Sequence, residues 1–124
     1  MDDQSPAATL TPEQMRRLAP ALARDGDYTA EDIRTLVERG ECQAWPSHGS
    51  IAVTEIRQHP RNRALNIWLA AGRVQDFLEI EPQVRAWGRR QGCTKLTLTG
   101  RKGWSRVLDK HDWQLHSITL TRPL

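Results

Sequence analysis

Basic residues concentrate in the second half of the chain, around a loop bounded by two glycines. Arg85 and Arg89 are one helical turn apart and share a face if their segment is helical. The loop Gly100–Gly103 can hold an anion through its backbone N–H groups and its charge. We therefore expect one anion-binding or partner-binding surface, made of Arg101, Lys102, Arg85 and Arg89. The alternatives are a solvated basic face and a nucleic-acid surface, although no helix-turn-helix, zinc-finger or RNP signature accompanies it.

Histidines and cysteines show no metal-ligand spacing. The histidines stand at positions 48, 59, 111 and 116, and the cysteines at positions 42 and 93. No CxxC, GxSxG or P-loop pattern occurs, so we expect no metal and two ordinary buried thiols. Two isolated cysteines suit a reducing compartment, and no signal-peptide or membrane-span pattern is present. The sequence predicts a cytoplasmic protein without membrane association.

The composition is that of one small folded domain. The chain has 124 residues, of which 38% are hydrophobic, and a net charge of +3. Residues 1–10 are polar and are expected to form a disordered lead, with residues 11–124 as a single domain. Five tryptophans stand against one Tyr and one Phe. They indicate a Trp-rich core, in which Trp87 and Trp104 are mostly buried, or else a stacking platform for aromatic rings.

Capping patterns predict the first two helices. Thr11 begins one with a capping box completed by Gln14, and Thr29 begins the next in the same way. Pro20 is expected to kink or break the first helix, and Gly40 to end the second.

The remaining elements follow from changes in hydrophobic period. Alternation predicts strands, and 64–70 is the clearest, with Leu65, Ile67 and Leu69 on one face. A helix is expected over 74–91, split by Pro82, and another over 104–110. The predicted strands are 43–45 (ended by Pro46), 50–57, 64–70, 94–99 and 114–121. The resulting order is α-α-β-β-β-α-β-α-β, a mixed α/β (α+β) sheet in which 64–70 and 94–99 form a central parallel pair.

This order resembles the GNAT (GCN5-related N-acetyltransferase) fold over about residues 11–121. The most specific stretch runs from Ala64 to Trp113 and contains NIWLAAG, AWGRRQGCTKLTLTGRKGW and RVLDKHDW. It looks like small GNAT-like proteins of tailed bacteriophages. The resemblance implies acetyl-CoA as the cofactor, with its pyrophosphate on a glycine-containing turn at a helix N-terminus. The matching positions here are Ala71, Gly72, Arg73, Val74 and Gln75.

Two departures from the family pattern bear on chemistry. The motif Arg/Gln-x-x-Gly-x-Gly/Ala keeps one glycine here, Gly72, and the later helix has no tyrosine to act as a general acid. The resemblance leaves Glu55 as a candidate general base, and His111 could protonate a leaving thiolate. The alternatives are a solvated strand carboxylate and an ordinary surface histidine.

These departures favour a GNAT-like protein with lost or weak acetyl transfer. Such a protein would act by binding another protein, of phage or host, as an accessory or virion-associated component in the host cytoplasm. The alternative is an active acetyl-CoA-dependent N-acetyltransferase. A nucleic-acid-binding accessory protein is a second alternative.

Overall fold

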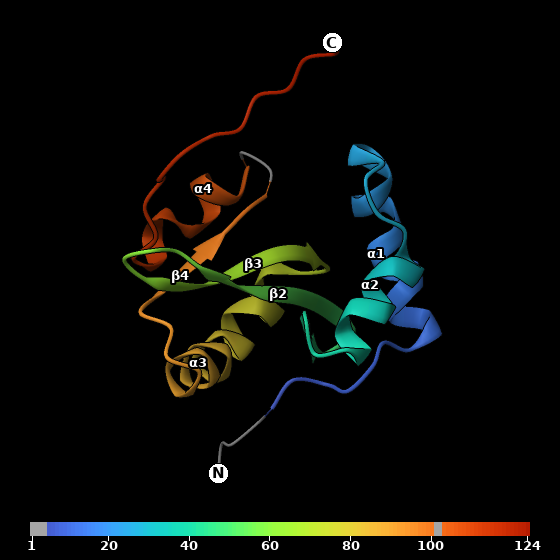
Figure 1. Cartoon of the computed structure of the whole chain (residues 1–124), viewed down its shortest axis with the longest axis horizontal. Coiled ribbons are helices and arrows are strands. Elements are labelled where there is room, and N and C mark those ends of the chain that lie inside the picture. Colours follow the sequence, from blue (N-terminus) through green and yellow to red (C-terminus); the bar gives the residue numbers. More distant parts are fainter. Residues whose placement is uncertain (1–4, 101–102) are drawn as a thin grey trace.

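A computed structural model of the chain describes residues 5–100 and 103–124. Its centre is a four-stranded sheet in the order β1-β2-β3-β4 (Figure 1). The strands are β1 (Gln43–Ser47), β2 (Ser50–Gln58), β3 (Arg63–Ala71) and β4 (Lys95–Leu98). The helices are α1 (Pro12–Asp25), α2 (Ala30–Glu38), α3 (Val74–Arg90) and α4 (Gly103–Leu108), followed by the 3₁₀ turn η1 (Asp109–His111).

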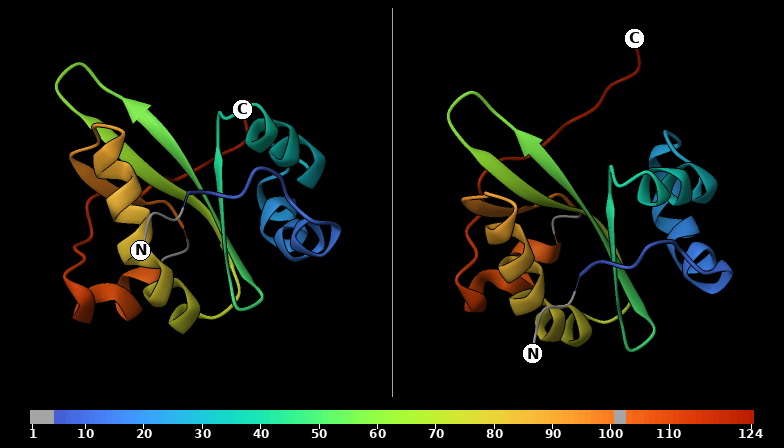
Figure 2. Two further views of the ribbon diagram at one scale, coloured as in Figure 1. Left: turned by 90° about the horizontal axis from the view of Figure 1, so that it is seen from below. Right: turned by 60° about the horizontal axis from the view of Figure 1, so that its bottom comes forward.

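The sheet is antiparallel from β1 to β3 and parallel between β3 and β4. The parallel register runs from Ala64 opposite Lys95 to Ile67 opposite Leu98. This confirms the predicted pairing of residues 64–70 with 94–99, bridged by a helix. Helix α3 covers one face of the sheet, and α1 and α2 cover the other (Figure 2). The expected mixed α/β (α+β) architecture is therefore confirmed.

Both predicted capping boxes are present. Thr11 and Gln14 exchange hydrogen bonds at the start of α1, and Thr29 and Asp32 do so at the start of α2. The second helix ends as predicted before Gly40, which has a left-handed backbone with φ 78°.

Of the kink or break predicted at Pro20 and the split predicted at Pro82, the break and the split are wrong, because α1 and α3 both run through their prolines. An internal proline costs about 3 kcal/mol by removing a backbone hydrogen bond and crowding the preceding turn. Leu18 and Leu22 anchor α1 on both sides of Pro20 in the same core cluster. In α3 the half-buried side chains before and after Pro82 likewise share one cluster with buried Val84. Packing on both sides of each proline therefore outweighs its local cost.

The first strand continues through Pro46, where the sequence predicted its end. Strand β1 is an edge strand, and Pro46 is exposed on it. The carbonyl of Ala44, two residues earlier, points away from β2 and accepts a hydrogen bond from the Ala7 N–H at 2.9 Å. Residues two apart orient their backbone groups alike, so the missing N–H of Pro46 also faces outward and costs the sheet no hydrogen bond.

The N-terminal lead is ordered where it is described. Besides the bridge of Ala7 to β1, Leu10 is 4% exposed and belongs to the core packed by α1 and α2. The prediction of disorder over residues 1–10 is therefore wrong for residues 7–10, and residues 1–4 lie outside the described residues. Burial of one apolar side chain and one backbone hydrogen bond compensate for ordering this short segment.

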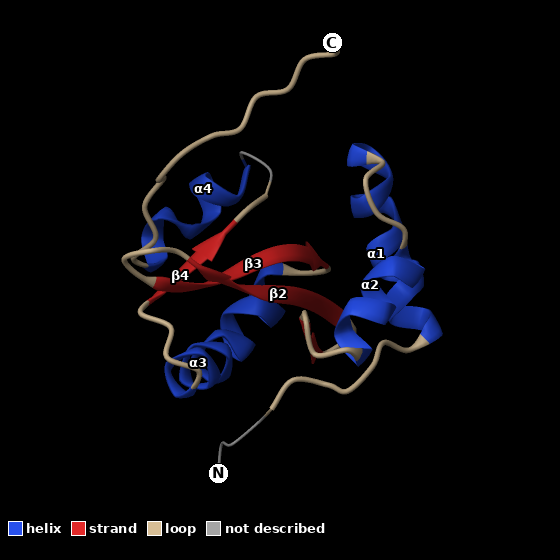
Figure 3. Ribbon diagram, viewed as in Figure 1, coloured by secondary structure: helices blue, strands red, loops and turns tan. Residues whose placement is uncertain are grey.

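The predicted last strand over residues 114–121 is wrong. Residues 114–124 form a loop that leaves the domain without pairing with β4 (Figure 3). Its large apolar side chains are strongly exposed, and Ile118 and Leu120 retain 69% and 84% of their accessible surface. Without a partner to bury them, the alternating pattern of this segment has no face to pack.

Candidate functional site

Strands β3 and β4 part after their last paired residues. The Thr99 N–H donates to the Ile67 carbonyl at 2.9 Å, and beyond it β3 continues to Ala71, paired only with β2. The parting opens a hollow of about 280 Å³, which we call the splay cleft. Its walls are β3 residues 67–71, residues 98–100, Trp104, and the α1 residues Arg17, Pro20, Ala21 and Arg24.

Trp104 stands where the strands separate. It lines the splay cleft on the α1 side and also the apolar hollow on the α3 side. There its ring meets Phe77 edge to face, with 5.6 Å between centroids. Trp104 and Trp87 are intermediate in exposure, which agrees with the prediction that both are mostly buried, and Trp45 is the tryptophan at 2% exposure. Trp104 thus stands between the splay cleft and the apolar hollow, at the point where β3 and β4 part.

A bulge in β3 shapes the cleft wall. The register with β2 shifts between Val53, opposite Leu69, and Thr54, opposite Ile67, which leaves Trp68 as the extra residue. Leu69 consequently packs in the α1–α2 cluster, while Leu65 packs with α3. The prediction that both share one face is wrong, because an extra residue reverses the alternation beyond it. The bulge places Trp68 and Leu69 together at the splay cleft.

The predicted cofactor residues Ala71, Gly72, Arg73, Val74 and Gln75 form the end of β3, the following turn and the start of α3. Gly72 has φ 135°, and a Cβ there would overlap Ser50. The Arg73 N–H donates to Ser50 Oγ at 2.9 Å, and Ser50 Oγ donates to Asp76 Oδ2 at 2.6 Å. The turn is therefore held from below by a serine on β2 and a carboxylate in the first turn of α3.

Ser50 and Asp76 were missed by sequence reasoning. Asp76 is 2% exposed and Ser50 is 3% exposed. An acidic residue in the first turn of a helix is an ordinary N-terminal signal, so neither residue stands out in the sequence. Their contact is a product of the tertiary fold, because 26 residues separate them.

This turn fits a pyrophosphate poorly. At a helix start the first N–H groups lack intrahelical acceptors, but that of Arg73 is already bound to Ser50. The space beside Gly72 is filled by Ser50. The buried Asp76 carboxylate lies in the same helical turn, 3.8 Å from the Arg73 guanidinium, and its negative charge offsets the attraction of that arginine for an anion. The backbone N–H groups of Val74 and Gln75 remain available to a pyrophosphate. These are fewer donors than the family motif implies.

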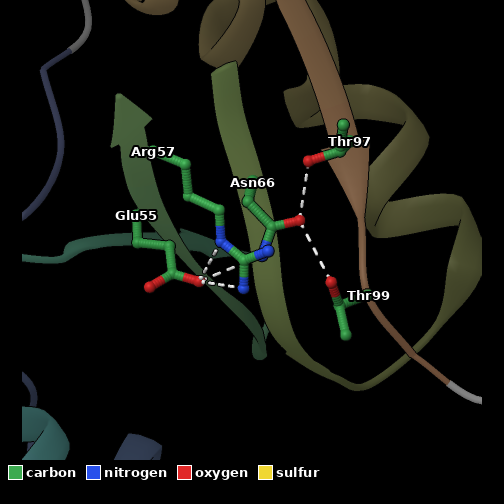
Figure 4. A network of polar contacts seen from close by, with 5 residues as sticks. All are labelled: Glu55, Arg57, Asn66, Thr97 and Thr99. Atoms are coloured by element: carbon green, nitrogen blue, oxygen red, sulfur yellow. Dashed lines mark hydrogen bonds and ion pairs between the residues drawn. The ribbon is translucent and has the colours of Figure 1, made fainter. Parts of the chain in front are cut away.

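Glu55 lies in a polar network that crosses three strands (Figure 4). Its Oε2 accepts hydrogen bonds from Arg57 Nε at 3.1 Å, Arg57 Nη2 at 2.9 Å and Asn66 Nδ2 at 3.1 Å. Asn66 is 1% exposed, and its Oδ1 accepts from Thr97 at 2.7 Å and Thr99 at 3.2 Å. Glu55 does not line the splay cleft, and it reaches that cleft only through Asn66 and Thr99. This arrangement ties the strands together where they begin to part.

The other candidates lie away from the splay cleft. His111 is exposed on η1 and is not among the cleft-lining residues. Arg85 and Arg89 line a separate hollow, the far hollow, with Lys95 at the opposite end of β4 from Gly100. Arg101 and Lys102 lie outside the described residues. The structure therefore does not place Arg85 and Arg89 on the rim that carries Gly72.

Three arginines of α1 that the sequence analysis did not select lie beside the rim that carries Gly72. Arg17 and Arg24 of α1 line the splay cleft. Arg16 and Arg17 line an adjoining hollow, which we call the loop hollow, together with Ala71 and Gly72. Arg17 and Arg24 are seven residues apart, so they share one helical face after two turns. This seven-residue spacing is the feature of the sequence that could have identified the two arginines as a pair.

Among the described residues, no group of three or more His, Cys, Asp or Glu side chains could hold a metal ion. In the same part of the chain, no helix is both long enough and apolar enough to span a membrane.

No protein-family model and no curated protein matches the chain. Solved structures match nearly all of it. A tetramutant of a Bacillus halodurans protein superposes with a TM-score of 0.66 at 12% identity, covering 90% of this chain and 92% of that chain. A Trypanosoma brucei acetyltransferase has a TM-score of 0.62 at 13% identity, covering 94% and 96%. An aminoglycoside acetyltransferase from an uncultured soil metagenomic sample, in complex with sisomicin, has a TM-score of 0.62 at 11% identity, covering 90% and 86%. At these identities the similarity is one of fold, and the chain has a GNAT-like fold.

Proposed function

We propose that this GNAT-like protein binds a ligand in the splay cleft without transferring acetyl groups. One observation carries the proposal. Among the residues that the structure describes, the lining of the cleft includes no carboxylate, histidine, tyrosine, lysine or cysteine that could exchange a proton with an amine or a thiolate. General acid–base catalysis requires such a group within hydrogen-bond reach of the reacting atoms. The cleft offers arginines, apolar walls and the Thr99 hydroxyl instead.

The turn at Gly72 supports the same conclusion for the cofactor. Ser50 uses the amide of Arg73, and the buried carboxylate of Asp76 offsets the charge of the Arg73 guanidinium 3.8 Å away, so the turn offers a pyrophosphate little net attraction. Acetyl-CoA should therefore bind weakly. Amine acceptors are also disfavoured, because an aminoglycoside, the class of compound bound by one similar structure, carries several amino groups that Arg17 and Arg24 would repel.

We further propose that the protein has an accessory role, in which it binds another protein. It rests on the resemblance of residues 64–113 to small phage proteins, together with the absence of proton-transfer groups from the described lining of the cleft. The alternative is an active N-acetyltransferase, which the shared fold of the acetyltransferase structures favours.

Calorimetry with acetyl-CoA, joined to a thiol-release assay with a panel of amines, separates these functions. We expect a dissociation constant weaker than about 100 μM, equivalent to about −5.5 kcal/mol, and no turnover above a heat-denatured control. Asp76→Asn keeps an acceptor for Ser50 but removes the charge, so it should bind acetyl-CoA more tightly than wild type. Its thermal unfolding provides the check on folding. Low-micromolar binding with turnover by the wild type would establish the enzyme instead.

A further inference from the structure

The splay cleft and the loop hollow adjoin each other. Arg17, Pro20 and Ala71 line both. Together they follow the exposed side of α1 along the end of β3, from Gly72 to Gly100, and they have volumes of about 280 and 480 Å³. We call the two adjoining hollows together the α1–β3 groove.

The described lining of this groove is cationic. Arg16, Arg17 and Arg24 face a single carboxylate, Glu13. Three other arginines, Arg34, Arg57 and Arg73, have an acidic partner, as with Arg34 and Glu31 at 2.7 Å. Within the described residues, no ion pair joins Arg16, Arg17 or Arg24 to an acid. The groove therefore carries an excess of two positive charges, counted as three arginines less one glutamate.

The position of the Arg17 guanidinium is informative. A Cβ placed on Gly49 would lie 3.9 Å from Arg17 Nη2. Arg17 thus reaches from α1 to the β1–β2 turn, next to Ser50 and the turn at Gly72. Arg24 lies two turns along α1, at a rise of about 10 Å. Two arginines whose backbones are this far apart on one helical face can each form a bidentate pair with an acidic group of one extended ligand.

We propose that the α1–β3 groove binds an anion that carries at least two phosphate or carboxylate groups, with Arg17 and Arg24 as the binding residues. The walls formed by Trp68, Leu69 and Trp104 accept an apolar part of the same ligand. This assignment rests on the proposed function, because it takes the splay cleft as the ligand site. The proposed ligand is anionic, so polycationic amines are excluded as ligands of the groove.

The test measures binding of tripolyphosphate and of citrate by calorimetry at low ionic strength, where screening is weak. The first probe represents phosphate and the second carboxylate, so their ranking identifies the preferred group. Arg17→Glu/Arg24→Glu should weaken binding of the preferred probe at least tenfold. Arg85→Glu/Arg89→Glu, in the far hollow, makes the same change in charge and should alter binding less than twofold. Spermine, a polycation, should not bind to the wild type.

Four exposed arginines contribute little to stability, so both double variants should unfold like the wild type. Equal losses in the two variants would attribute binding to overall charge and overturn the assignment. So would unchanged binding in the Arg17/Arg24 variant, or a wild type that binds neither probe. Acetyl transfer by a wild type whose anion binding still depends on Arg17 and Arg24 would overturn the proposed function alone.

Discussion

Ser50 Oγ donates a 2.6 Å hydrogen bond to Asp76 Oδ2 and accepts one from the Arg73 N–H at 2.9 Å. One hydroxyl thereby uses its donor and an acceptor site to join the first residue of β2 to the first turn of α3. Both side chains are buried, so the contact is shielded from water. The turn that a cofactor phosphate would have to occupy is already organised by the protein itself.

Removing this hydroxyl should destabilise the domain. Ser50→Ala leaves a buried carboxylate and a backbone N–H without their partner, which should lower the free energy of unfolding by about 2–3 kcal/mol. Ser47→Ala is the matched control, since Ser47 Oγ donates to the Asp76 carbonyl at 3.0 Å from a less buried position. Its cost should be about 1 kcal/mol or less. Urea unfolding measures both, and equal losses would contradict the central role of Ser50.

A side chain at Gly72 should be tolerated even less. Gly72 combines φ 135° with direct overlap of an added Cβ with Ser50. Gly26 also has a positive φ, 71°, but has open space around its Cβ position. Gly26→Ala should therefore cost only the backbone strain of about 1 kcal/mol, whereas Gly72→Ala adds steric overlap and should cost about 3 kcal/mol or more. Thermal unfolding compares them, and similar melting temperatures would contradict the overlap.

The sequence was sufficient for those elements whose signals are local. The capping boxes at Thr11 and Thr29 depend on residues three apart, and both were predicted. The parallel pair followed from two β-rich runs around one amphipathic segment, which is a strong topological constraint. The continuation of the helices through Pro20 and Pro82 has no local signal, because the packing that holds both helices is tertiary.

The site was predicted only in part, for similar reasons. The spacing of the family motif identified the turn at Gly72, but the Ser50–Asp76 contact joins residues that no local pattern connects. The faces of β3 were predicted up to Ile67 and reversed beyond it, since a bulge at Trp68 leaves no signature in the hydrophobic alternation. The apolar pattern of α1 carries no signal for Arg17, because the groove lies on the exposed face of the helix.

The Cys42 thiol should make stability depend on pH. Burial, with smaller contributions from Glu55 and Glu41, raises the pKa of Cys42 from 9.0 to about 11. Above pH 9 the unfolded chain releases this proton more readily than the folded one, so the stabilisation present below pH 9 is lost as pH rises to about 11. The loss should approach about 2–3 kcal/mol. The difference between wild type and Cys42→Ala isolates it, because other groups titrate equally in both proteins. A difference that stays constant from pH 8 to about 11 would contradict the raised pKa.

The C-terminal segment should be dispensable for folding. In residues 114–124, Leu115, Ile118 and Leu120 are at least 69% exposed, and the segment forms no strand. An exposed segment that buries little apolar surface contributes little to stability, so deleting residues 114–124 should change the melting temperature by about 2 °C or less.

Trp113 provides the contrast for this deletion. It is half-buried and lines the apolar hollow with Leu108 and Phe77, so a deletion that starts at Trp113 should cost a further 1–2 kcal/mol, roughly the value of partly burying a large aromatic side chain. Hydrogen exchange gives an independent measurement, in which the amides of residues 115–121 should exchange at the rate of an unfolded peptide. Protected amides there, together with a large loss of stability in the shorter deletion, would show that the segment pairs with the free edge of β4 after all.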